Sequence, residues 1–109
     1  MITDLNYLKT MSGDDPKFIR EMIQIFTEQI AEYSELMPAL LQNKDYVNLS
    51  KMAHKAKSSV AVMGMNQVAD LLKDLELLAG EGKEVERYEG LIDEFLDKSR
   101  QALVELTAN

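Results

Sequence analysis

The sequence predicts an all-α fold, an up-down antiparallel four-helix bundle with a short N-terminal helix that caps one end. Apolar residues recur at three- and four-residue spacing over long stretches, which is the period of an amphipathic helix. No segment alternates apolar and polar residues over more than a few positions, and glycine and proline are scarce, with 5 and 2 copies. Long helices joined by short loops pack best as such a bundle, and 109 residues suffice for a single domain over 1–109.

The chain is expected to begin with a short helix at residues 4–9, followed by a polar break at 12–15. Asp14 or Asp15 can cap the next helix, because an aspartate side chain accepts hydrogen bonds from the free amides of a first helical turn. Pro16 then falls in that first turn, where its missing amide proton costs nothing. A second helix should therefore start at this proline.

An apolar stripe marks the second helix and runs from Phe18 to Met37 at helical spacing. Pro38 lies inside this pattern, lacks a backbone donor and clashes with the preceding turn. We therefore expect a kink or break at Pro38, with helical structure continuing through residues 39–41.

A third helix is expected from Tyr46 to about Met63, after a turn in which Asp45 supplies the cap. Gly64 follows in the position where a left-handed residue commonly ends a helix. This helix carries His54, which is the only histidine of the chain.

A fourth helix, capped by Asn66, is expected to run through Ala79 and to be broken at residues 80–82, which include two glycines. The last helix then covers about Glu84 to Leu106. Both segments carry apolar residues at helical spacing, so each can present one face to a shared core.

The composition excludes several classes of function. The chain has 12 basic and 19 acidic residues and a net charge of −7, which disfavours binding to nucleic acid or to an anionic membrane surface. It has no cysteine, and no apolar run approaches the roughly 20 residues of a membrane span. The N-terminus lacks the basic start and apolar stretch of a signal peptide, so we expect a cytoplasmic protein.

His54 is predicted to point away from the core of the bundle. At roughly 100° per residue, the apolar residues of its helix gather on a face centred roughly 150° from the histidine. That face is expected to be buried, and it consists of Leu49, Met52, Ala53, Ala56, Val60 and Met63.

The residues that share the face of His54 are small or cationic. Ser50, Ser58 and Ala61 lie within about 60° of it, so a partner can approach the imidazole closely. Three lysines add positive charge around it on a chain that is otherwise strongly acidic; they are Lys51, Lys55 and Lys57.

An exposed imidazole on a rigid helix can accept a phosphoryl group. A neutral ring nitrogen attacks phosphorus as a nucleophile, and a nearby ammonium offsets the charge that is gained. Lys57, one turn beyond His54, is placed for this role. Two plainer interpretations stay open at this point: an ordinary surface histidine, and lysines that form a solvated helix face.

The order and spacing of several short motifs resemble the histidine-containing phosphotransfer (HPt) domain of multistep two-component relays. An Ala-His pair is followed by a lysine and small residues, then by a Leu-Gly-like pair that closes the helix and by a Leu-Glu pair one helix later. The resemblance covers essentially the whole chain, and the combination is more specific than any single motif. The residues that carry it are 53–59, 63–64, 75–76, 13–14, Phe18 and Phe26.

The resemblance implies a role for each residue that matches the family pattern. His54 resembles the phosphorylated histidine, and Lys57 resembles the lysine that stabilises the phosphoryl group. Gly64 resembles the glycine that ends the active helix. Glu76 occupies the position whose polar side chain can hydrogen-bond the active imidazole and hold its tautomer, although an ordinary solvated glutamate fits equally well.

Two positions depart from the commonest family pattern. Ser58 stands where glycine is frequent, and its hydroxyl leaves a partner slightly less room but can itself bond phosphoryl oxygens. Ala56 stands where a larger aliphatic residue is frequent, and it faces the core. Neither change removes a group that the chemistry needs. The residues expected to contact a partner beside the histidine are Ser50, Lys51, Lys55, Ala61, Val62 and Met65. Packing against a neighbouring helix stays open as the alternative for Ala61, Val62 and, above all, Met65.

The function implied by the resemblance is that of a phosphorelay intermediate. His54 would accept a phosphoryl group from the phospho-aspartate of one receiver domain and pass it to an aspartate of another. The expected partners are response-regulator receiver domains and a hybrid sensor histidine kinase, with Mg²⁺ bound by the receiver and no cofactor bound by this chain, which we expect to be a monomer. The chain has no glycine-rich phosphate loop, so we expect no ATP site and no kinase activity of its own.

Other functions find less support in the sequence. A metal-carboxylate bundle needs Glu-x-x-His pairs, whereas Lys51 stands three residues before the only histidine, so we expect no metal site. No calcium loop and no Gly-x-Ser-x-Gly elbow is present. The remaining alternative is a non-catalytic docking module that binds and regulates a receiver or kinase; the presence of both His54 and Lys57 argues against it.

Overall fold

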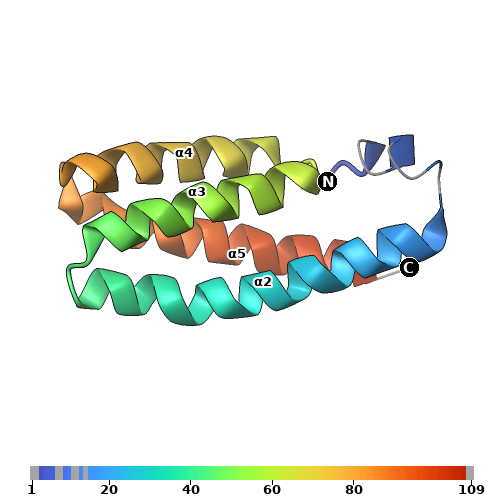
Figure 1. The fold of residues 1–109 in the computed structure, drawn as a ribbon, viewed down its shortest axis with the longest axis horizontal. Helices are drawn as coiled ribbons and strands as arrows, with labels where there is room; N and C mark the ends of the chain where they lie inside the picture. The colour runs from blue at the N-terminus through green and yellow to red at the C-terminus, as the bar shows by residue number, and fades with distance from the viewer. Residues whose placement is uncertain (1–2, 7–8, 11–12, 14, 108–109) are drawn as a thin grey trace.

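The computed structural model describes residues 3–6, 9–10, 13 and 15–107. Its long helices run alternately in opposite directions along the bundle (Figure 1). The predicted all-α, up-down bundle is thereby confirmed, and the described residues contain no strand. The bundle is elongated, with extents of 42 × 20 × 20 Å. The elements are α2 (Pro16–Gln42), α3 (Tyr46–Val62), α4 (Asn66–Glu81), a 3₁₀ turn η1 (Val85–Arg87) and α5 (Tyr88–Thr107).

The N-terminal segment lies against the turn between α3 and α4. The amide of Asp4 donates to the carbonyl of Met63 at 3.0 Å, and the amide of Lys9 donates to the carbonyl of Leu5 at 2.9 Å, which is a helical bond. Residues 7–8 of the predicted helix at 4–9 lie outside the described residues. The segment therefore covers one end of the bundle, as expected.

The starts of α2 and α3 follow the predicted capping chemistry. The Asp15 carboxylate accepts from the amide of Lys17 at 3.0 Å, and the Asp45 carboxylate accepts from the amide of Asn48 at 3.2 Å. Asp14, the alternative cap for α2, lies outside the described residues. Each aspartate satisfies an amide that has no partner within its helix.

Of the kink or break predicted at Pro38, the break is wrong, since α2 is continuous from Pro16 to Gln42. Met37, just before the proline, is buried, and Leu40 and Leu41, just after it, are half-buried against the core, so both halves are held in place. Pro38 itself is exposed, and the carbonyl that loses its amide partner lies one turn before it. The expected helical continuation after it is confirmed.

The predicted boundaries of α4 are also shifted. Asn66 is the first helical residue rather than the cap, and the helix continues through Gly80 to Glu81. The left-handed residue that ends it is Gly82, at φ +65°. The last helix begins later than predicted, because a 3₁₀ turn after Glu84 precedes it. Gly80 has helical backbone, so only one of the two glycines is used as a cap.

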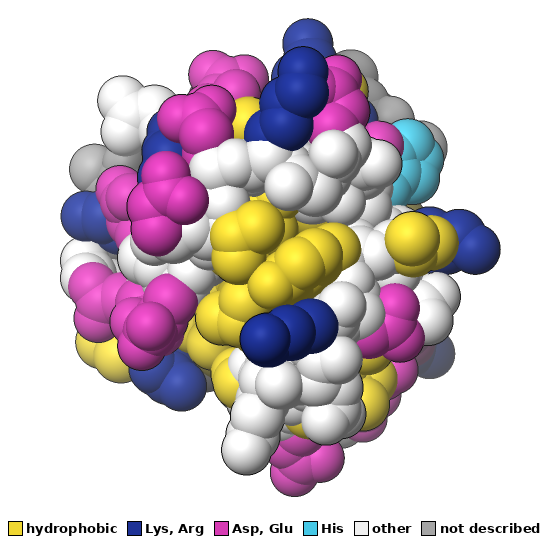
Figure 2. Space-filling model, turned by 90° about the vertical axis from the view of Figure 1, so that its left-hand side faces the viewer, with side chains coloured by type: hydrophobic (Ala, Val, Ile, Leu, Met, Phe, Trp, Pro, Cys, Tyr) yellow, Lys and Arg dark blue, Asp and Glu magenta, His cyan; other side chains and the backbone are white. Residues whose placement is uncertain are grey.

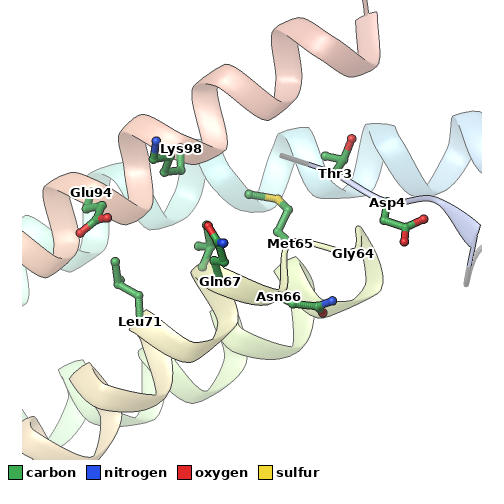
Figure 3. Close-up of a pocket in the computed structure, with 10 residues that line it drawn as sticks. Thr3, Asp4, Gly64, Met65, Asn66, Gln67, Leu71, Glu94 and Lys98 are labelled. Carbon is green, nitrogen blue, oxygen red and sulfur yellow. The ribbon is translucent and has the colours of Figure 1, made fainter. Parts of the chain in front are cut away.

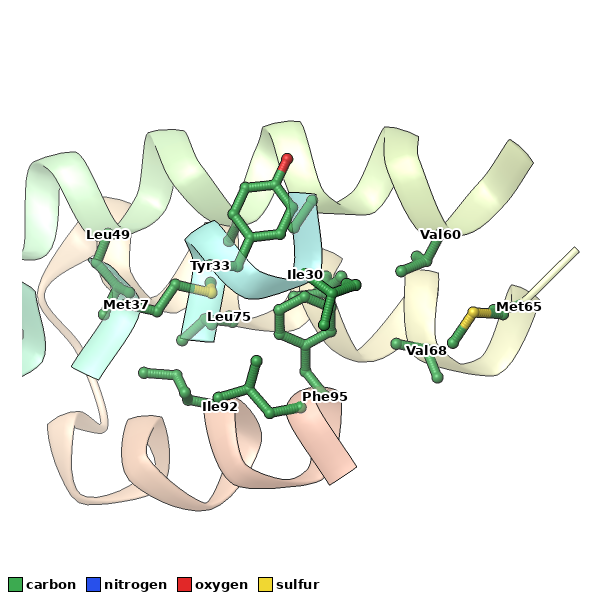
Figure 4. Packing of buried hydrophobic residues seen from close by; sticks show 14 of the residues in the cluster. Ile30, Tyr33, Met37, Leu49, Val60, Met65, Val68, Leu75, Ile92 and Phe95 are labelled. Atoms are coloured by element: carbon green, nitrogen blue, oxygen red, sulfur yellow. The ribbon is translucent and has the colours of Figure 1, made fainter. Parts of the chain in front are cut away.

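The core lies along the axis of the bundle and takes side chains from all four helices (Figure 4). Tyr33 of α2 and Phe95 of α5 meet at 6.1 Å between ring centroids. The Tyr33 hydroxyl points toward α3, where it lies 3.3 Å from Oγ of Ser59. Burial of these large apolar side chains is the main source of stability, and it fixes which face of α3 is turned outward.

Gly64 is required by both its backbone conformation and its surroundings. Its φ is +72°, and a Cβ there would lie 2.0 Å from the carbonyl oxygen of Asp4. Gly64→Ala should therefore lower the free energy of unfolding by about 1–3 kcal/mol, measured by urea denaturation. Gly82→Ala is the matched control, because φ is +65° there but a Cβ would have no atom of the described residues within 4 Å. An equal loss in both variants would contradict a steric role for the Asp4 contact.

Candidate functional site

The middle of α3 carries His54 on its outer face, as the helical phase predicts. The His54 side chain is 61% exposed. Figure 2, which views one end of the bundle, shows the histidine projecting from its rim. The opposite face is buried at Leu49, Ala53, Ala56, Val60 and Met63, and only Met52 of the predicted set is half-buried instead.

A single carboxylate on α4 contacts both of the predicted phosphotransfer residues on α3. Oε2 of Glu76 lies 2.9 Å from Nδ1 of His54, and Oε1 lies 3.3 Å from Nζ of Lys57. The side chains of Lys57 and Glu76 are 30% and 24% exposed, so both are partly shielded while the imidazole is open. The carboxylate thus bridges two residues that stand one turn apart.

This contact determines which nitrogen of His54 carries the proton. An ionised carboxylate can only accept hydrogen bonds, so Nδ1 must be the donor at 2.9 Å. In the neutral ring the lone pair is then on Nε2. The arrangement therefore presents Nε2 as the nucleophilic atom of an exposed imidazole.

The ionised state of Glu76 is favoured by its partners. Partial burial raises the pKa of the Glu76 carboxyl, but the hydrogen bonds from Lys57 and His54 outweigh it and hold the pKa below its ordinary value. Because the folded-state pKa is depressed, these contacts stabilise the fold above the ordinary glutamate pKa, and that contribution is lost as the pH falls through the folded-state pKa.

A titration tests this account of Glu76. Lys57→Met removes one hydrogen-bond donor and one positive charge, so the pKa of the Glu76 carboxyl should rise relative to wild type. The side-chain carboxyl signal followed by ¹³C NMR against pH measures it directly. Lys55→Met is the control, because Lys55 is exposed on the same helix. A Glu76 titration unaffected by Lys57→Met would show that the ion pair is not formed in solution.

Most of the predicted neighbours of His54 lie on the accessible surface of α3. Lys51, Lys55, Ser58 and Ala61 are exposed. Ser50 differs, because it is half-buried and its hydroxyl donates to the backbone carbonyl of Glu76 at 2.7 Å. Its polar group is therefore directed at α4 rather than at solvent, which argues against the predicted partner contact.

Met65 is wrongly predicted as a partner-contact residue. Its side chain is 1% exposed and belongs to the core. The left-handed turn at Gly64 redirects the chain, and the Met65 side chain points from the start of α4 into the bundle (Figure 3). Helical phase carried forward from α3 could not predict this change of direction.

A shallow groove between α2 and α3 begins beside the histidine. It includes Ser58, one turn after His54, and the half-buried Val62. From α2 it adds Met22 and Ile25, which is 45% exposed. The sequence did not predict a role for these two residues. Their spacing placed them on the apolar stripe of α2, but it could not show which part of that stripe α3 leaves uncovered.

Two classes of site find no candidate in the described part of the chain. Within residues 3–6, 9–10, 13 and 15–107, no three His, Cys, Asp or Glu side chains gather closely enough to hold a metal ion. Over the same residues, no helix combines the length and apolar character needed to cross a membrane.

The comparisons with known proteins agree with this geometry. The sequence model of the Hpt domain family matches residues 21–108. The chain is similar to the phosphorelay intermediate protein YPD1 of Candida albicans, with 28% identity over 61 residues, which are 56% of this chain and 33% of that relative. The match thus spans about a third of the relative's length. No solved structure matches the chain. Because the family match covers most of the sequence and includes α3 with its exposed histidine, the chain belongs to the Hpt domain family.

Proposed function

We propose that this chain is a phosphorelay intermediate in two-component signal transduction, which carries a phosphoryl group on His54 between two receiver-domain aspartates. One observation carries the proposal: an exposed imidazole whose Nδ1 is held by the Glu76 carboxylate at 2.9 Å. Membership of the Hpt family and the similarity to a protein named as a phosphorelay intermediate support it.

The transfer step uses the lone pair on Nε2 of His54. Nε2 attacks the phosphorus of an aspartyl phosphate, a P–N bond forms, the P–O bond breaks, and the aspartate leaves as a carboxylate. The proton on Nδ1 stays in its hydrogen bond to Glu76, so the positive charge that develops on the ring faces a negative one. Attack by the next receiver's carboxylate on the same phosphorus reverses these changes.

Lys57 supplies positive charge for the phosphoryl oxygens. It stands one turn after His54 and is paired with Glu76 at 3.3 Å in the unphosphorylated protein. When phosphate arrives at Nε2, the ammonium can turn toward its oxygens, because a lysine side chain is long and flexible. The exposed hydroxyl of Ser58 is a second group available to the phosphoryl oxygens.

The partner we propose is a receiver domain that docks over α3 and the groove beside it. A domain that brings an aspartyl phosphate to His54 must also cover Ser58, and this residue lines the groove with Met22, Ile25 and Val62. Lys51 and Lys55 offer positive charge at the edge of that surface. In this proposal the Mg²⁺ is bound by the receiver, and a hybrid sensor kinase supplies the first phosphoryl group.

The alternative, a docking module that carries no phosphate, is separated from the relay by one experiment. The chain is mixed with a phosphorylated receiver and Mg²⁺, and the phosphate on the chain is tested for stability. A phosphohistidine is labile in acid and stable in base, so the relay predicts a label with that behaviour. Receiver binding without any such label would support the docking module instead.

A further inference from the structure

Ser50 and Gly80 form a close contact between α3 and α4, one helical turn from the His54–Glu76 pair. The Ser50 hydroxyl donates to the backbone carbonyl of Glu76 at 2.7 Å. A Cβ on Gly80 would lie 3.2 Å from that same hydroxyl, closer than an ordinary van der Waals contact. The two helices therefore approach here at a distance that a side chain at position 80 would disturb.

The backbone conformation of Gly80 does not itself require a glycine. Gly80 lies within α4 with an ordinary helical conformation, and the left-handed cap of this helix is Gly82. Glycine is among the poorest helix formers, so at a helical position it lowers stability unless a neighbouring group needs the space that a side chain would fill. Gly90 in α5 provides the contrast, since a Cβ there would meet no atom within 4 Å in the described part of the chain.

The close contact acts on the residue that holds the histidine. Ser50, His54 and Lys57 stand on successive turns of α3, and all three contact Glu76. The Ser50 hydroxyl contacts the backbone carbonyl of Glu76, whereas His54 and Lys57 contact its carboxylate. A glutamate side chain has several rotatable bonds, so the reach of its carboxylate depends on where its backbone stands. A shift of α4 along α3 would move the carboxylate away from Nδ1.

We propose that Ser50 and Gly80 are positioning residues, which fix Glu76 along α4 so that its carboxylate meets Nδ1 of His54. The effect on phosphotransfer rests on the proposed function, but the positioning itself is a property of the unphosphorylated protein. Neither residue is expected to touch the phosphoryl group.

The test measures the histidine ring in the full chain without phosphate. Ring ¹⁵N NMR under mildly alkaline conditions reports how the proton is shared between Nδ1 and Nε2. In wild type the proton should reside on Nδ1, and in Ser50→Ala and Gly80→Ala a substantial share should move to Nε2. If either residue had a purely structural role, a variant with a native helical circular dichroism spectrum would keep the wild-type ring signals.

Two variants serve as matched controls. Ser34→Ala removes a hydroxyl that donates to the carbonyl of Ala31 at 2.8 Å within α2, and Gly90→Ala adds a methyl group to a helix where there is room for it. Both should keep the wild-type ring signals. If Ser50→Ala and Gly80→Ala also keep them, the proposal is overturned.

The rate of phosphorylation by a phosphorylated receiver provides the second readout. Loss of one net hydrogen bond should slow it by about twofold to tenfold in Ser50→Ala and Gly80→Ala. If the ring signals of Ser50→Ala and Gly80→Ala differ from those of wild type, but neither wild type nor the variants take up phosphate, the positioning role is supported and the relay function is contradicted. If wild type takes up phosphate and the variants keep the wild-type ring signals, the relay function is supported and the positioning role is contradicted.

Discussion

His54→Gln is expected to abolish phosphorylation of this chain by a phosphorylated receiver. Glutamine is polar and of similar size, but its amide nitrogen is not a nucleophile toward phosphorus. His54 is 61% exposed, so the substitution should change the free energy of unfolding by less than about 0.5 kcal/mol. The measurement is the amount of acid-labile, base-stable phosphate on the purified chain, which should fall to background.

Binding of the receiver is the control for this variant. A receiver that docks over the α2–α3 groove should bind His54→Gln with nearly unchanged affinity, because the groove residues are intact. A label that persists in His54→Gln would place the phosphoryl group on another residue and contradict the assignment.

Lys57→Ala is expected to slow phosphoryl transfer by about 10- to 100-fold. A charge-assisted hydrogen bond to the transferring group contributes about 1.5–3 kcal/mol, and the variant loses it in the transition state. Its second effect, release of Glu76 from the 3.3 Å ion pair, leaves the carboxylate on Nδ1 of His54. The loss should therefore appear in the rate at saturating receiver, measured by rapid quench, while the helical content stays native.

Lys55→Ala separates this effect from docking. Lys55 is exposed on the same helix and has no contact with Glu76 among the described interactions, so its removal should weaken receiver binding without lowering the saturated rate. Equal saturated rates in wild type and Lys57→Ala would take Lys57 out of the transfer step.

Helical periodicity was sufficient to predict which residues of α3 face outward. The exposure of His54 and the burial of Ala53 and Ala56 follow from a 3.6-residue repeat that holds throughout the helix. The same repeat fails at Met65, because the left-handed Gly64 turns the chain before the next helix begins. Periodicity within one element cannot predict a direction beyond its end.

The helical repeat could not predict the contacts between helices. Ser50 lies on the predicted face of α3, but phase does not show that the backbone of α4 passes within hydrogen-bond distance of its hydroxyl. The alignment of Glu76 with His54 was suggested only by the family resemblance, since it depends on the register between α3 and α4. The groove residues Met22 and Ile25 were missed for the same reason.

Passage of the phosphoryl group through the chain is the most direct test of the relay. The chain is labelled from one phosphorylated receiver, purified, and mixed with a second, unphosphorylated receiver and Mg²⁺. The relay predicts that label leaves His54 and appears on the second receiver faster than it is released as inorganic phosphate. Label that stays on the chain until it hydrolyses, with every receiver tried, would contradict a carrier function.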